Sequence, residues 1–163
     1  MPAGRLLLAA LAAPAMTQSA PPTASFAQLF DRPVAATDIA GAVGDCVEAD
    51  GGADRLADRR WKRVEIAGLP GGMLPYRRDP TGPVLVLPSV ANPLRCWVMA
   101  SPSDDRVIVV NAIGARLQVP NLGNAASPGW RTKDHTLVFD WMTTPGKPQM
   151  MRVEVYKFPQ ESK

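Results

Sequence analysis

Few side chains in this sequence could act as nucleophiles or bases. His135 is the only histidine, and Cys46 and Cys96 are the only cysteines. A catalytic serine or cysteine needs a base within hydrogen-bond reach, so a site of that kind would depend on His135. The sequence contains no Gly-x-Ser-x-Gly turn that would expose a serine. The pattern favours a histidine at the edge of a strand, and a small secreted hydrolase that uses His135 or a pair of carboxylates is the enzymatic alternative.

Metal and cofactor chemistry have little support in the sequence. A zinc site needs about three or four converging ligands, and one histidine with two distant cysteines does not supply them. The acidic residues Asp45, Glu48, Asp50 and Asp54 lack the spacing of a calcium-binding loop and are expected to be solvated charges at a helix end. Glycine motifs that bind phosphate or dinucleotides are also missing. We therefore expect no metal ion and no cofactor.

The densest group of charges is basic and surrounds Trp61. We define the basic cluster as Arg55, Arg59, Arg60, Lys62 and Arg63, together with Arg77 and Arg78 if the following strands pair. Such a cluster could bind an anionic partner: a polyanion, a membrane surface or an acidic protein. Asp54 and Asp58 lie among these cations and weaken their field. The pattern therefore favours a solvated helix face with Trp61 in the core, and the anionic-partner patch is the alternative.

The N-terminus follows the pattern of a secretory signal peptide over residues 1–15. Arg5 supplies a positive charge, residues 6–13 are apolar, and Ala13-Pro14-Ala15 offers small residues for cleavage. Eight apolar residues are too few to cross about 30 Å of hydrocarbon, so we expect no transmembrane span. Export would place the mature chain in the periplasm or outside the cell.

The mature chain is expected to be a flexible leader, residues 16–24, followed by a single domain, residues 25–163. Loss of residues 1–15 removes one arginine and no acid, which lowers the formal net charge from +3 to +2. A charge this small gives no long-range field for nucleic acid, so no nucleic-acid partner is expected.

Cys46 and Cys96 are expected to form one disulfide. In an exported domain they have no other cysteine to pair with, and neither belongs to a Cys-x-x-Cys redox motif. Cys46 lies late in a predicted helix beside Asp45, where the helix dipole and the acid oppose a reactive thiolate. The bond would tie that helix to the strand that contains Cys96.

Residues 37–50 are predicted to form the first long helix. Ile39 and Cys46 belong to one apolar stripe at helical spacing. Thr37 or Asp38 can accept a hydrogen bond from the free amides of the first turn. A second, short helix is predicted over residues 53–60.

A third helix is predicted from Ser101 to Leu117. Ser101 can cap it, and Pro102 suits the first helical position. Residues 107–110 are all β-branched and could instead form a strand. The spacing of apolar residues through Leu117 favours the helix.

The remaining periodicity predicts short strands separated by turns. They cover residues 62–66, 73–76, 84–87, 94–100, 135–143 and 151–158. Residues 120–129 are expected to form a polar loop, and Thr144-Pro145-Gly146-Lys147 suits a type II turn. The fold class is α+β: an antiparallel sheet of about five to six strands with helices on one face, in the order α-α-β-β-β-β-α-β-β.

Two resemblances follow from this arrangement. The order of elements resembles the α-β-β-β-α-β-β order of type III secretion chaperones, and this likeness covers topology only. Phe26, Cys46, Trp61, Cys96 and the segment from Ser101 resemble small exported bacterial proteins of unassigned function. The second likeness implies a shared fold and no particular activity.

These features predict an exported, non-enzymatic α+β domain that acts by binding a protein or another component of the cell envelope. The hydrolase and the polyanion or membrane-surface binder are the two alternatives. A cleft that gathers His135 with a serine and an acid would favour the enzyme. A closed core with an exposed apolar or basic face would favour the binder. The sequence specifies no oligomeric state.

Overall fold

The computed structural model describes residues 30–158, apart from positions 51, 67–68, 70–71, 80–81, 83, 90–94 and 125. The expected signal peptide and leader, with Phe26, therefore lie outside the described residues. The described part contains three helices: α1 (Ala36–Glu48), α2 (Ala53–Asp58) and α3 (Arg106–Leu117). None of these helices has the length and apolar character needed to cross a membrane.

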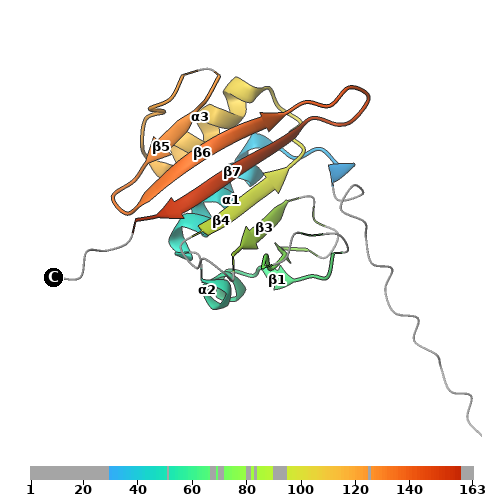
Figure 1. The fold of residues 1–163 in the computed structure, drawn as a ribbon, viewed down its shortest axis with the longest axis vertical. Coiled ribbons are helices and arrows are strands. Elements are labelled where there is room, and N and C mark those ends of the chain that lie inside the picture. The colour runs from blue at the N-terminus through green and yellow to red at the C-terminus, as the bar shows by residue number, and fades with distance from the viewer. Residues whose placement is uncertain are drawn as a thin grey trace, which may run out of the picture.

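Seven strands form one antiparallel sheet in the described part of the chain (Figure 1). They are β1 (Lys62–Arg63), β2 (Tyr76–Arg77), β3 (Leu85–Pro88), β4 (Arg95–Ala100), β5 (Gly129–Arg131), β6 (His135–Met142) and β7 (Met150–Lys157). Their order across the sheet is β1-β2-β3-β4-β7-β6-β5, so α3 carries the chain from the middle of the sheet to its far edge. The α+β class is confirmed.

The predicted count of five to six strands is wrong, because β5 was not predicted; it begins at Gly129, the last residue of the expected loop, and continues to Arg131. β5 has only three residues, too few to show an alternating pattern. Its pairing with β6 sets Trp130 opposite Leu137, and both side chains are buried. A tertiary contact, and not local propensity, therefore makes this strand.

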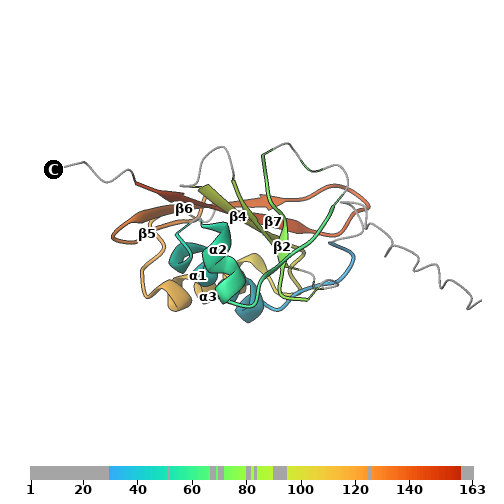
Figure 2. The ribbon, with the colours of Figure 1, turned by 90° about the horizontal axis from the view of Figure 1, so that it is seen from below.

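The helices lie on one side of the sheet (Figure 2). Ile39, Val43 and Ile113 are fully buried, and they belong to one apolar core with Val98 and Val153 of the central strands. Residues 107–110 are helical, because Val109 and Val110 face this core at helical spacing. The helix, and not the strand, is therefore correct for this segment.

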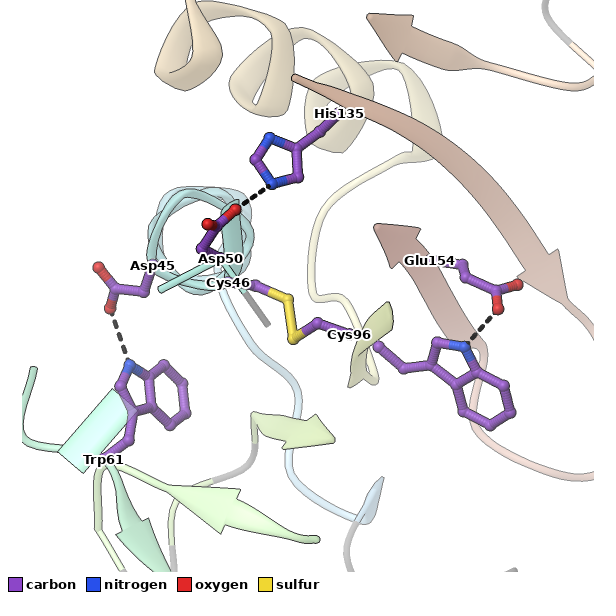
Figure 3. The surroundings of a disulfide bond; sticks show 8 residues. Asp45, Cys46, Asp50, Trp61, Cys96, His135 and Glu154 are labelled. Atoms are coloured by element: carbon purple, nitrogen blue, oxygen red, sulfur yellow. Dashed lines mark hydrogen bonds and ion pairs between the residues drawn. A yellow bond between two sulfur atoms is a disulfide. The ribbon is translucent and has the colours of Figure 1, made fainter. Parts of the chain in front are cut away.

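The disulfide joins α1 to the central strand β4, as the sequence predicted. Cys46 and Cys96 are bonded with their Cα atoms 6.3 Å apart, and both residues are buried (Figure 3). Cys96 pairs with Val155 of β7, so the bond fixes α1 over the middle of the sheet.

The predicted start of the third helix is wrong. Ser101 and Pro102 are extended, and the N–H of Val34 donates to the carbonyl oxygen of Ser101 at 2.8 Å. The N–H of Ser103 donates in return to the carbonyl oxygen of Val34. Because these backbone groups of residues 101–103 find their hydrogen-bond partners outside a helix, α3 begins only at Arg106. Asp105 occupies the N-cap position without a side-chain hydrogen bond.

The predicted local cap of α1 is also wrong. Ala35 is the N-cap residue, and neither Thr37 nor Asp38 caps the helix. Asp104, from the segment before α3, accepts the N–H of Ala36 at 2.7 Å. A carboxylate distant in sequence therefore accepts a hydrogen bond from one of the first-turn N–H groups of α1, which have no acceptor within the helix.

The opposite side of the sheet has a smaller apolar cluster at one end. Phe30, Leu85, Leu87 and Met99 are buried there, beneath partly buried residues such as Val64. The predicted strand over 62–66 is shorter in the structure, where β1 covers only 62–63. The N–H of Val64 still donates to the carbonyl oxygen of Pro75 at 2.9 Å, and Val64 and Ile66 pack against this cluster. We call the remainder of this side, formed by β4, β7, β6 and β5, the open face.

Candidate functional site

The structure divides the basic cluster into paired and exposed cations. Acidic residues of α1 and the turn after it pair with three of its arginines. Arg59 Nη1 lies 2.5 Å from Glu48 Oε2, and Arg55 Nη1 lies 3.8 Å from Asp50 Oδ2. The third arginine, Arg78, pairs with an acid deeper in α1.

The other cations of the cluster differ in burial. Arg77 is buried in β2, where burial lowers the pKa of its guanidinium and the charge of Asp79 opposes that shift. Arg60, Lys62 and Arg63 are exposed and form no ion pair with the described residues. The seven cations therefore do not form one continuous surface.

Asp45 connects Trp61 and Arg78 to α1. The Trp61 indole N–H donates to Asp45 Oδ2 at 2.8 Å (Figure 3). Arg78 Nη2 donates to the same oxygen at 2.5 Å. The guanidinium of Arg78 also lies over the Trp61 ring, 5.3 Å from its centroid. Asp45 is buried, so the expectation that this acid is a solvated helix-end charge is wrong. It instead holds two side chains in fixed positions.

His135 is buried at the start of β6 and pairs with Asp50, which follows α1. Its Nε2 lies 3.1 Å from Asp50 Oδ1 (Figure 3). Lys157 of β7 donates to the other carboxylate oxygen. The hydrogen bond from Lys157, opposed by burial, lowers the pKa of Asp50 below its usual value of 3.8. This arrangement joins the end of α1 to β6 and β7.

The described residues contain no group of three or more histidine, cysteine or carboxylate side chains that could hold a metal ion. The acids near α1 are instead matched by arginine, lysine, histidine and the Trp61 indole.

The open face carries a network centred on Glu154 of β7. The Trp97 indole N–H donates to Glu154 Oε1 at 2.6 Å, and Arg95 Nη2 lies 2.9 Å from the same oxygen. Arg95 also donates to the Tyr156 hydroxyl at 2.9 Å and lies over the Tyr156 ring. Burial and the Glu154 carboxylate raise the pKa of the Tyr156 hydroxyl.

Two further arginines lie against aromatic rings of this side. Arg152 is 5.0 Å from the Trp97 ring centroid, and its Nη2 contacts Asp140 Oδ2 at 2.5 Å. Arg131 is 5.0 Å from the Phe158 ring centroid. Trp97, Tyr156 and Phe158 thus each have an arginine over the ring, an arrangement that orders both partners.

Exposed apolar side chains border this network. Val138 and Met142 of β6 are 42% and 36% exposed, and Phe158 is 37% exposed. Glu154 is only 7% exposed, although it belongs to an uncovered side of the sheet. Solvent therefore meets apolar groups and guanidinium groups on the open face far more than it meets this carboxylate.

Sequence reasoning missed the open face. The alternation in residues 135–143 and 151–158 showed that two sets of side chains face opposite sides. Only the register of β4 with β7 sets Trp97 opposite Glu154, and that pairing is 57 residues apart in sequence. The His135–Asp50 contact, which spans 85 residues, was missed for the same reason.

Comparison of the chain with known protein families, with curated proteins and with solved structures finds no match. The function is therefore argued from the residues themselves.

Proposed function

We propose that this protein is an exported, non-enzymatic domain that binds a protein partner through the open face. The observation that carries the proposal is the ordered group of Trp97, Tyr156 and their arginines on a side of the sheet without helices. Tryptophan, tyrosine, arginine and methionine are the residues enriched where proteins bind one another.

Pre-organisation of these side chains supports the proposal. Glu154 holds the Trp97 indole and the Arg95 guanidinium in place before any partner arrives. Immobilising a long side chain on binding costs about 0.5–1.5 kcal/mol. Side chains that are already ordered avoid most of that cost.

The charges favour a partner whose apolar contact area is bordered by carboxylates. Three arginines and two acids lie on the open face. Arg95 pairs with Glu154 and Arg152 pairs with Asp140, so Arg131 leaves these five side chains with a net charge of +1. The net field at this surface is positive, so it attracts an acidic border and repels a basic one.

The two alternatives receive less support. The buried His135–Asp50 pair accounts for the histidine without catalysis. Polyanion binding relies on Arg60, Lys62 and Arg63, the exposed cations of the cluster that form no ion pair with the described residues. It predicts retention of the protein on heparin that is lost at moderate salt.

Photo-crosslinking in the native envelope tests the open face. A benzoylphenylalanine in place of Val138 should yield a discrete adduct. The same group in place of Val107, which is 67% exposed on α3, serves as the matched control. The substitution Arg131→Glu should reduce the Val138 adduct about tenfold, because it reverses a charge that faces the partner.

Identical adducts from both positions, or none from position 138, would contradict the assignment of the open face. Export is tested on the same material. The mature protein should lack residues 1–15 by intact-mass measurement. Retention of those residues would contradict the assigned compartment.

A further inference from the structure

The strand β5 lies at one edge of the sheet, and alternate residues of it direct their backbone groups away from β6 (Figure 1). Along an antiparallel ladder, hydrogen-bonded pairs alternate with pairs that share no hydrogen bond. Pro128 and Phe139 form a bonded pair, since the Phe139 N–H donates to the Pro128 carbonyl oxygen. The register therefore turns the N–H and C=O groups of Gly129 and Arg131 outward.

Gly129 has partners for its outward groups, whereas Arg131 has none among the described residues. The Gly129 N–H donates to Asn121 Oδ1 at 2.9 Å, and its carbonyl oxygen accepts the Leu122 N–H at 2.8 Å. The segment that leads into β5 thus covers the edge at Gly129 and stops short of Arg131, which is exposed. An exposed donor and acceptor on a strand edge can pair with the backbone of another extended chain.

A pocket lies beside this free position, on the open face. Its volume is about 360 Å³, and its lining includes Leu122, Gly129, Arg131 and Val138. This volume is within the range of about 300–1,000 Å³ that is usual for ligand pockets. Leu122 and Val138 are 66% and 42% exposed, and Gly129, opposite Val138 in the ladder, has no side chain to fill the space. The pocket therefore offers accessible apolar walls to one side chain of a partner.

The Arg131 side chain gives this edge its charge. It lies over the Phe158 ring, 5.0 Å from the centroid, and forms no ion pair with the described residues. A guanidinium that stacks by its face keeps the N–H donors of its edge available to a carboxylate. Lys133 and Asp134 in the following turn cancel in charge, so Arg131 sets the sign.

We propose that an extended segment of the partner adds to β5 as an antiparallel strand, paired with the backbone of Arg131. This inference rests on the proposed function and names the form of the partner. Directly opposed residues lie on the same side of a sheet, so the partner residue opposite Arg131 is an aspartate or glutamate that meets the guanidinium.

The pocket determines a second residue of the partner. The Asn121–Leu122 segment blocks further pairing, so the added backbone rises over Leu122 after a single bonded pair. Because side chains alternate along a strand, the residue two positions after the acid returns to the open face and enters the pocket as an apolar group. The partner segment therefore reads acid-x-apolar.

A second copy of this chain fits the edge poorly. Two β5 edges joined at their free groups would set Arg131 of one copy directly opposite Arg131 of the other. Like charges in that position are destabilising. The occupant is therefore a segment of a different protein.

Binding of short peptides to the full mature protein tests the assignment. The probe acetyl-Thr-Glu-Thr-Leu-Thr-amide should bind saturably with a Kd below about 1 mM and should shift the NMR signal of the Arg131 amide. Three altered probes each remove one contact. N-methylation of the glutamate removes the N–H that donates to Arg131, lysine in place of glutamate reverses the charge, and exchange of leucine with the central threonine turns the leucine away from the pocket. Each should bind at least about fivefold more weakly.

Leu122→Ser is the informative variant, because Leu122 is exposed and lines the pocket. It should weaken binding of the probe about fivefold through loss of apolar contact. Val107→Ser is the matched control. Val107 is 67% exposed on α3 and lies outside the pocket lining, so this change should leave binding unaltered.

Three results would overturn strand addition: no saturable binding of the probe, equal binding of the N-methylated probe, or equal effects of Leu122→Ser and Val107→Ser. A dimer of the mature protein that Arg131→Glu alters would assign the edge to a second copy and would overturn it too. If the Val138 photo-adduct persists while the probe fails to bind, strand addition is wrong and the open face still binds a partner. If that adduct is missing as well, both assignments are wrong.

Discussion

Asp45 illustrates how one buried charge can order several segments. Its carboxylate accepts from the Trp61 indole and from Arg78, and Arg59 lies 3.8 Å from its other oxygen. A buried carboxylate is unfavourable unless such donors surround it. The donors in turn gain fixed positions, with Arg78 held over the Trp61 ring.

Asp45→Ala should therefore destabilise the protein by about 1–3 kcal/mol, because it leaves the buried indole N–H without an acceptor. Urea unfolding followed by circular dichroism measures the change. Asp54→Ala, an exposed position on α2, should cost less than about 0.5 kcal/mol. Equal losses in the two variants would show that the contacts of Asp45 contribute nothing beyond those of a surface acid.

The lowered pKa of Asp50 predicts that the stability of the protein falls as the solution becomes acidic. Its pKa is lowered in the folded state, first by the hydrogen bond from Lys157, with His135 also nearby. Because the folded pKa lies below the unfolded one, Asp50 stabilises the protein above pH about 4. That contribution is lost as the pH falls through the folded pKa. Arg55, 3.8 Å away, is the other cation that faces this carboxylate.

Asp50→Asn should therefore be less stable than the wild type at pH 6, and the difference should shrink towards pH 3. Urea unfolding at both pH values measures it. Asp54→Asn should follow the wild-type profile. A stability difference between Asp50→Asn and the wild type that stays constant with pH would contradict the role given to Asp50.

At the scale of elements, the order of helices and strands was largely predictable from periodicity. The hairpin of β6 and β7 was clearest, and Gly146 has the positive φ of 72° that its turn requires. The N-termini of the long helices were not predictable. Asp104 could be recognised as a cap for α1 only after the chain folds, because the contact spans 68 residues.

The substitution Asp104→Ala should destabilise the protein by about 0.5–2 kcal/mol, the usual cost of losing a helix cap. Thermal unfolding measures this change. Thr37→Ala, which removes the residue that the sequence pattern favoured as a local cap, should leave the stability nearly unchanged. The reverse order of effects would support a local cap and contradict the contact with Ala36.

The candidate surfaces were less predictable than the elements. Trp61, Arg78 and the paired cysteines could be singled out by residue type alone. The open face could not, because it depends on how four strands align, and each strand shows only that its alternate residues face opposite sides.

At the scale of the whole molecule, the disulfide ties the helical layer to the sheet. The two cysteines are 50 residues apart, and the closed loop contains α2 and β1–β3. Those elements are short: β1 and β2 have two residues each. Trp61 and two residues of the small apolar cluster, Leu85 and Leu87, lie in this loop. A bond that closes the loop therefore stabilises the region in which local structure is weakest.

The double substitution Cys46→Ala and Cys96→Ala should lower the free energy of unfolding by about 4 kcal/mol, because the unfolded chain regains the freedom of a 50-residue loop. Chemical denaturation measures the loss. Reduction of the wild-type protein is the matched control, since it opens the bond without removing either side chain, and it should produce most of the same loss. Exchange of backbone amides should then rise first in residues 53–88, because this part of the sheet has the shortest strands. A reduced protein as stable as the oxidised one would show that packing alone holds α1 on the sheet, and would remove the structural argument for an oxidising compartment.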